Sequence, residues 1–135
     1  MTLTGDDREF LDQPAYMRLA TLMPDGSPQL TVLWYRRDGD RLHVICPQSA
    51  QKVANLDRDS RASAVIEDPA SAHRFIELRG ECAVLRDDAM ARRELREIAR
   101  RYIGDRAEGF VDGLSEAPRV VLQLTPERVI RYGIS

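Results

Sequence analysis

The sequence has 135 residues, enough for one domain with a substantial hydrophobic core. Hydrophobic residues make up 43% and charged residues 31%, as in an ordinary globular protein, and a net charge of -2 gives no reason to expect nucleic-acid binding. No apolar run approaches a membrane span and the polar start shows no signal-peptide pattern, so we expect a cytoplasmic protein with no membrane contact.

The first part of the chain predicts one short helix and three strands. Residues 5–13 carry acidic side chains in the first turn and stop at a proline, which is typical of a short helix. Residues 15–22 and 29–37 read as strands joined by a Pro-Asp-Gly turn. The Asp-Gly pair at 38–39 then predicts a hairpin into a strand over 41–46.

A helix and two more strands follow. Residues 49–58 read as a helix with Ser49 as its N-cap. Residues 61–68 are typical of a buried strand. Residues 75–85 alternate between apolar and charged side chains, so the even-numbered positions from 76 to 84 should face the core.

The last part predicts a long helix and two strands. The helix covers 87–103, where acidic residues alternate with five arginines, so we expect a solvated outer face that does not bind nucleic acid. The strands are 119–124 and 128–133, joined around Thr125 and Pro126.

Together these elements make six or seven mostly antiparallel strands with two or three inserted helices. This pattern favours a mainly β protein, a barrel or a sandwich, over a parallel sheet. No linker or internal repeat divides the chain, so we expect one domain over residues 1–135.

Lys52 is the only lysine, since the other nineteen basic residues are arginine. It falls in the first turn of the helix predicted over 49–58, where a cation opposes the helix dipole unless an anion binds there. The free N–H groups of a helix start, the Ser49 hydroxyl, the Gln51 amide and the Lys52 ammonium would together suit a phosphate. The alternative is an ordinary solvated surface lysine.

Other chemistry is sparse in this sequence. His43 and His73 have no clustered acidic or thiol partners along the chain, so we predict no metal site. Cys46 and Cys82 lack metal or redox spacing, which favours buried, reduced thiols. There is no P-loop or Ser/His/Asp arrangement, so we predict no catalytic side chain and expect a bound cofactor to supply the reactivity.

The order of three stretches carries a resemblance to a known family. They are "LATLMPDGSPQLTVLWYRRDGDRLHVI", "SAQKVANLDRDSRASAVIED" and "FIELRGECAVL". The specific piece is a lysine, two residues, Asn-Leu and then Arg-Asp-x-Arg-Ala-Ser, which begins at Lys52. Over Tyr16 to Tyr132 the sequence resembles the pyridoxamine 5'-phosphate oxidase-like split β-barrel family, most of all its small actinobacterial-type members that use FMN or a deazaflavin.

The resemblance implies a split β-barrel homodimer with inserted helices and a cofactor cleft between the subunits. It implies an oxidoreductase that transfers a hydride between the deazaflavin coenzyme F420 and a small organic substrate, with FMN as the alternative cofactor. A non-catalytic flavin-binding or storage module is the other alternative. Trp34, Tyr35 and Phe75 are candidates for the subunit interface, and each is also a candidate for the core.

The resemblance also assigns contacts to the cofactor. The ring would be contacted by the strand backbone at Gln29, Leu30, Thr31 and Val32. The phosphate would be bound by Ser49, Ala50, Gln51 and Lys52, with Asn55 nearby. The cofactor would be approached from one side by His73 and Arg74. Two departures bear on this assignment. Some relatives carry an arginine where Ala50 stands, so Lys52 and the backbone would carry more of the contact. The chain also stops at "RVIRYGIS" without an arginine-rich segment, so we do not expect vitamin B6 oxidation.

Overall fold

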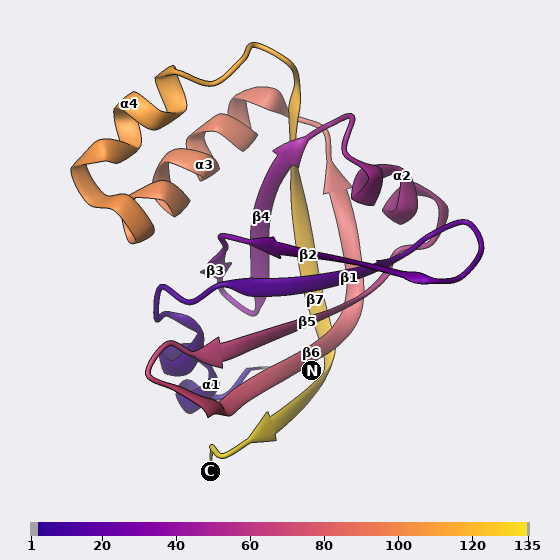
Figure 1. The fold of residues 1–135 in the computed structure, drawn as a ribbon, viewed down its shortest axis with the longest axis vertical. Helices are drawn as coiled ribbons and strands as arrows, with labels where there is room; N and C mark the ends of the chain where they lie inside the picture. Colours follow the sequence, from indigo (N-terminus) through magenta and orange to yellow (C-terminus); the bar gives the residue numbers. More distant parts are fainter. Residues whose placement is uncertain (1–2, 135) are drawn as a thin grey trace.

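A computed structural model describes residues 3–134 of the chain (Figure 1). The strands are β1 (Met17–Leu22), β2 (Pro28–Leu33), β3 (Arg36–Asp38), β4 (Arg41–Pro47), β5 (Arg61–Asp68), β6 (Ser71–Leu85) and β7 (Arg119–Tyr132). The helices are α1 (Gly5–Leu11), α2 (Gln51–Arg58), α3 (Asp88–Ile103) and α4 (Ala107–Asp112), with a 3-10 turn η1 (Gly104–Arg106).

The strands form one seven-stranded sheet in the order β2-β1-β5-β6-β7-β4-β3, and every pairing is antiparallel. The sheet curls, so that β1 and β2 cross in front of β4 and β7 (Figure 1). This is the mainly β, split-barrel architecture with inserted helices that the sequence predicted. Within residues 3–134 no helix is long and apolar enough to cross a membrane.

The barrel core comes from alternate residues of the strands. In β6 the side chains of Ile76, Leu78 and Cys82 are buried, as the alternation predicted. Tyr35 is also fully buried, and its hydroxyl donates a hydrogen bond to the Leu11 carbonyl at 2.6 Å. Tyr35 is therefore a core residue and is excluded from any subunit interface.

Helix α1 is tied to the end of the chain through a buried carboxylate. Its capping box joins Thr4 and Asp7: the Asp7 N–H donates to Thr4 Oγ1 at 3.1 Å, and the Thr4 N–H donates to Asp7 Oδ2 at 2.9 Å. Arg131 Nε of β7 donates to Asp7 Oδ1 at 2.6 Å. These bonds hold α1 against the end of β7.

The C-terminal pair of strands is in fact one strand. β7 runs without a break from Arg119 to Tyr132, and Pro126 lies opposite Gly80 where the β6–β7 register shifts. A proline is tolerated at such an irregularity because no ladder hydrogen bond is required of it there. A Cβ on Gly80 would lie 2.0 Å from the Thr125 carbonyl oxygen, so the close approach of the two strands requires glycine.

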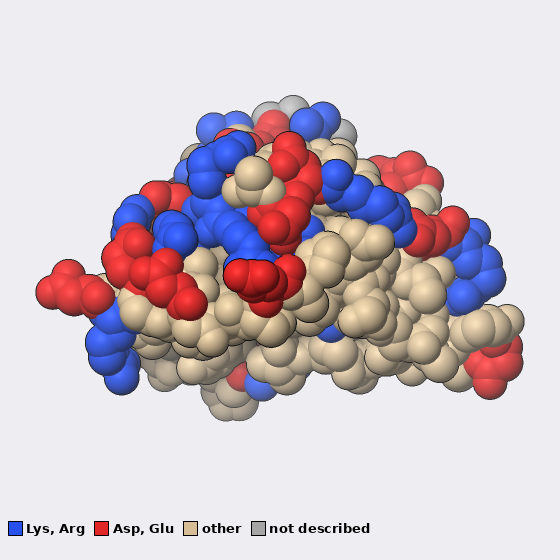
Figure 2. Space-filling model, turned by 90° about the horizontal axis from the view of Figure 1, so that it is seen from above, with Lys and Arg blue, Asp and Glu red and all other residues tan. Residues whose placement is uncertain are grey.

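The α3–α4 pair covers the face of β4 and β7 that lies outside the barrel core (Figure 1). α3 was predicted, whereas α4 was not, because its six residues include Gly109 and show no helical stripe. Arg96 of α3 binds Glu108 at 3.2 Å and Asp112 at 3.1 Å, which fastens α4 to α3. On the face that Figure 2 shows, positive and negative side chains are interspersed.

Candidate functional site

The start of α2 leaves backbone N–H groups free. Its N-cap is Ala50, so the prediction that Ser49 caps the helix is wrong. The Ala50 N–H donates to the Pro47 carbonyl at 3.0 Å, which closes a turn and delays the helix by one residue, while Ser49 is left exposed. Within the described chain no side chain caps this helix, and the N–H groups of Gln51 and Lys52 have no acceptor.

Lys52 lies half-buried in this first turn. Within residues 3–134 it forms no ion pair, although most of the arginines do. The Lys52 charge acts on the thiol of Cys46. Burial raises the pKa of this thiol, and the positive charge of Lys52 lowers it in part. A partly buried cation beside free helix N–H groups forms a local positive field, which suits an anion.

Asn55 connects α2 to the sheet. Its side chain is fully buried, and Nδ2 donates to Thr21 Oγ1 of β1 at 3.1 Å and to Gln29 Oε1 of β2 at 3.3 Å. Its Oδ1 accepts from Gln51 Nε2 at 3.0 Å. Asn55 therefore positions the start of α2 against β1 and β2, and its polar atoms are engaged by protein groups.

β2 is an edge strand, so one side of its backbone has no partner strand in the sheet. Gln29 and Thr31 are half-buried, whereas Leu30 is 69% exposed and Val32 63% exposed on the outer face. A planar ligand can thus form backbone hydrogen bonds along this edge and contact two apolar side chains.

His73 and Arg74 lie away from this group. They stand at the start of β6, next to the hairpin with β5, whereas α2 leads into the opposite end of β5. The eight residues of β5 extend over roughly 23 Å between the end of α2 and this hairpin. Arg74 is bound instead to Asp68 at 2.6 Å and lies over the Phe10 ring at 5.8 Å. Within one chain, these two residues therefore lie toward the far end of β5 from α2.

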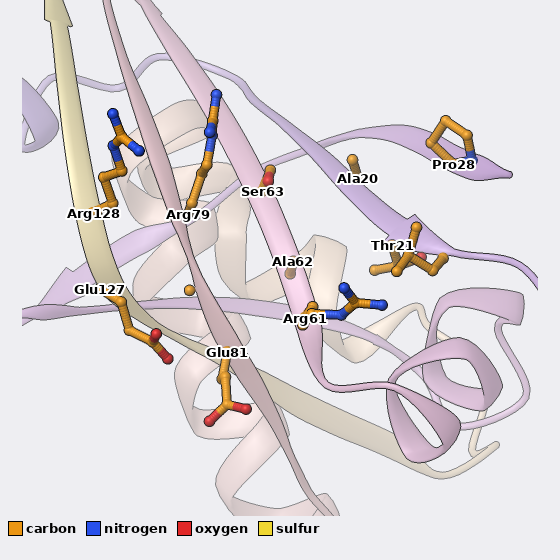
Figure 3. A pocket seen from close by; sticks show the side chains of 12 residues that line it. Ala20, Thr21, Pro28, Arg61, Ala62, Ser63, Arg79, Glu81, Glu127 and Arg128 are labelled. Atoms are coloured by element: carbon orange, nitrogen blue, oxygen red, sulfur yellow. The ribbon is translucent and has the colours of Figure 1, made fainter. Parts of the chain in front are cut away.

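An open groove of 610 Å³ lies on the outer face of the sheet and carries three arginines (Figure 3). Its lining comes from β1, β2, β5, β6 and β7: Ala20, Thr21, Leu22, Pro28, Arg61, Ala62, Ser63, Arg79, Gly80, Glu81, Glu127 and Arg128. Arg79 and Arg128 stand directly opposite each other on neighbouring strands, and Figure 3 shows them pointing the same way. Like charges in that position are destabilising unless they are compensated, and Arg79 is paired with Glu77 at 2.7 Å.

Sequence reasoning missed this groove because it depends on strand register. The alternation of β6 did place Glu77, Arg79 and Glu81 on its outer face, but nothing local revealed which side chains of β5 and β7 lie beside them. The observed pairing of Arg79 with Ser63 and Arg128 supplies that information.

His43 does have acidic neighbours, from positions distant in the sequence. Asp38, His43 and Glu94 place their ligand atoms within 4.8 Å of one another. However, the Glu94 carboxylate also accepts from Arg36 Nη2 at 3.0 Å, and His43 Nε2 is bonded to the Gln123 amide at 3.0 Å. Burial raises the pKa of Glu94, and hydrogen bonds from Arg36 and His43 outweigh it, so the pKa falls below its usual value. The three groups thus belong to an ion network that joins α3 to β3 and β4.

The seven-stranded split barrel, with an inserted helix bonded to its edge strand, defines the architectural class of this protein. A family model described as Pyridoxamine 5'-phosphate oxidase matches residues 3–132. The chain belongs to this family, whose members bind flavins. The family predicted from the sequence is confirmed.

Solved structures show the same fold. A conserved hypothetical protein, Rv2991 from Mycobacterium tuberculosis, superposes with a TM-score of 0.82 and 25% identity over 98% of this chain and 85% of that one. A protein named F420 Reductase superposes with a TM-score of 0.75 and 26% identity, over 95% of this chain and 98% of that one. HutZ, the heme storage protein from Vibrio cholerae, superposes with a TM-score of 0.73 and 19% identity, over 100% of this chain and 98% of that one. No curated protein matches the chain.

Proposed function

We propose that this protein is an oxidoreductase that binds the deazaflavin coenzyme F420 and serves hydride transfer between it and a small organic substrate. The observation that carries the proposal is the α2 start, where Lys52 and two free N–H groups lie on a helix that Asn55 bonds to Gln29 of the edge strand β2. The phosphate of such a cofactor needs an anion site. Its ring needs a strand edge with free backbone groups for hydrogen bonds and apolar side chains for contact. This chain offers both within one region.

The described residues fit such a group. Lys52 and the N–H groups of Gln51 and Lys52 would hold the phosphate, with Ser49 and Ala50 in the turn before them, and Asn55 would hold α2 in place. The free edge of β2, from Gln29 to Val32, would orient the ring. When bound, the cofactor supplies the hydride chemistry. The role of the chain is then to orient the ring and to exclude water from it.

The choice of F420 over FMN rests on similarity. The protein named F420 Reductase is 26% identical over 98% of its own length. FMN remains the second candidate, because members of the family bind flavins. Fluorescence titration of the purified protein with each cofactor separates the two, and tighter binding of FMN would overturn the first choice.

A non-catalytic flavin-binding module is the competing function. The fold also occurs in HutZ, which is named for heme storage, so the fold alone does not establish an enzyme. Steady-state turnover with the reduced cofactor and a quinone or enone acceptor decides between the two. Cofactor binding without turnover of any such acceptor would favour the storage role.

We also propose that the protein acts as a homodimer, with small molecules and neither nucleic acid nor membrane as its other partners. Leu30 and Val32 are largely exposed on the outer face of the sheet, where Phe75 stacks on Tyr132 with ring centroids 4.2 Å apart. A second copy would cover these side chains and could bring its own His73 and Arg74 to the site. Sedimentation of a stable monomer at micromolar concentration would contradict both the homodimer and the shared site.

Replacement of Lys52 tests the proposed site. Lys52→Ala should weaken binding of the cofactor roughly ten- to a hundred-fold, because a charge-assisted contact is lost. Lys52→Arg should be intermediate, since the charge stays but the guanidinium fork differs in shape from an ammonium. The melting temperature of the cofactor-free protein should hardly change, because a cation leaves the positive end of a helix.

The matched control is Arg41→Ala, which removes an exposed cation at the start of β4. It should leave cofactor affinity unchanged. Equal affinities in Lys52→Ala and the wild type would show that the phosphate binds elsewhere and would remove the basis of the proposal.

A further inference from the structure

A small, mostly apolar cavity of 190 Å³ lies between the α3–α4 pair and the sheet. Its lining is Trp34, Ile45, Leu95, Ile98, Phe110, Leu114 and Arg119. It shares no residue with the α2 site or with the arginine groove. Six of the seven side chains are apolar, so a ligand here gains mainly from burying hydrocarbon.

Aromatic rings form one wall of this cavity and hold it open. Trp34 stacks on Tyr102 with ring centroids 5.0 Å apart and planes at 5°. Phe110 of α4 meets Trp34 at 5.5 Å with planes at 51°, and it is 42% exposed. Tyr102 is fixed in turn, because its hydroxyl donates to the Ala15 carbonyl at 2.5 Å. Such fixed, tilted rings favour the insertion of another planar or branched apolar group.

Arg119 is the one charged residue that lines the cavity, and its guanidinium carries one unsatisfied donor. Its Nε is buried and has no hydrogen-bond partner among residues 3–134. The nearby carboxylate of Asp88 is already engaged, since it accepts from the Arg119 backbone N–H at 2.8 Å and from Arg92 Nε at 3.1 Å. A buried donor without an acceptor is unfavourable, so an anion that reached this nitrogen would be favoured.

We propose that this cavity binds a small carboxylate that carries a single ring or a branched apolar group of similar size. The volume compares with the roughly 150 Å³ of an apolar cavity that holds benzene. The ring would lie against Trp34 and Phe110, and the carboxylate would accept hydrogen bonds from Arg119, in the paired geometry that guanidinium and carboxylate adopt. The inference goes beyond the proposed function, because it requires no cofactor.

The position of the only tryptophan gives a direct measurement. The cofactor-free protein is titrated with benzoate, benzyl alcohol and acetate while Trp34 fluorescence is followed with excitation at 295 nm. Benzoate should change the emission and saturate. Benzyl alcohol, which lacks the charge, and acetate, which lacks the ring, should each bind at least roughly ten-fold more weakly. Equal binding of benzoate and benzyl alcohol would overturn the role of Arg119.

Variants locate the ligand. Arg119→Gln should raise the dissociation constant for benzoate roughly ten- to a hundred-fold and leave that for benzyl alcohol nearly unchanged. Phe110→Ala, at a partly exposed position, should weaken both ligands. Arg41→Gln, an exposed arginine outside the cavity, is the matched control and should change neither. Benzoate affinity that is the same in Arg119→Gln as in the wild type would overturn the proposal, as would an absence of saturable binding in the wild type.

Discussion

Asn55→Ala should destabilise the protein by breaking the connection between α2 and the first two strands. The side chain is fully buried, and it donates to Thr21 Oγ1 at 3.1 Å and to Gln29 Oε1 at 3.3 Å and accepts from Gln51 Nε2 at 3.0 Å. Each neutral hydrogen bond contributes about 0.5–1.5 kcal/mol net. Thr21 is only 2% exposed, so its hydroxyl would also lose its donor in a buried environment.

The expected loss in the free energy of unfolding is therefore about 2–3 kcal/mol. For a chain of this length, that loss lowers the melting temperature by roughly 6–12 °C. Urea unfolding followed by circular dichroism measures the free energy, and calorimetry measures the melting temperature. The matched control is Gln51→Ala, which removes only the bond to Asn55 Oδ1 from an exposed position and should cost less than about 1 kcal/mol.

A small effect would refute this reasoning. If Asn55→Ala unfolds within about 0.5 kcal/mol of the wild type, the hydrogen bonds of Asn55 contribute little net stability. Helix α2 would then be held by the packing of its buried Val53 and Leu56 alone. The polar contacts to β1 and β2 would have no energetic role.

Two further predictions concern a partly buried ion pair and a glycine. The Arg131 guanidinium, bonded to Asp7, holds the pKa of that carboxyl below its usual value. The stabilisation that the ionised Asp7 gives the fold is therefore fully present above the ordinary pKa of about 3.9, and it is lost as pH falls through the lowered pKa. Asp7→Asn should thus lower stability by about 1.5–3 kcal/mol at pH 7 and flatten its decline below pH 4, as measured by urea midpoints; an unchanged acid decline would contradict the assignment. Gly80→Ala places a Cβ 2.0 Å from the Thr125 carbonyl oxygen and should cost at least about 1–3 kcal/mol. Gly109→Ala, in α4 with open space around it, is the control and should be neutral or stabilising, and equal melting temperatures for the two variants would exclude steric conflict at Gly80.

The sequence by itself determined the mainly β class and the buried face of β6. It did not give every strand: the one predicted over 29–37 is two strands, β2 and β3, and the two predicted after 119 are the single strand β7. Alternation is a local property, since successive side chains of a strand point to opposite sides, and so Ile76, Leu78 and Cys82 could be assigned to the core. The short motif that begins at Lys52 also indicated the family, which the match over residues 3–132 confirms. Both inferences depend only on residues close together in the chain.

Two predictions are wrong because backbone geometry overrides the signal from side-chain identity. Thr125 and Pro126 read as a break, but β7 continues through them because the irregularity opposite Gly80 accommodates a proline. Ser49 reads as an N-cap, but the turn from Pro47 to Ala50 moves the helix start by one residue. In each case the deciding contact lies in backbone geometry that side-chain identity does not specify.

Only the tertiary structure decided which residues form a site. It joined Asn55 to Thr21 and Gln29, and it set His73 and Arg74 at the far end of β5 from Lys52. Strand register brought the three arginines of the outer groove together, and the packing of α3 and α4 left the guanidinium of Arg119 at an apolar cavity. The physical reason is that sequence patterns fix the local direction of a side chain, whereas its neighbours across the sheet depend on how the whole sheet pairs and curls.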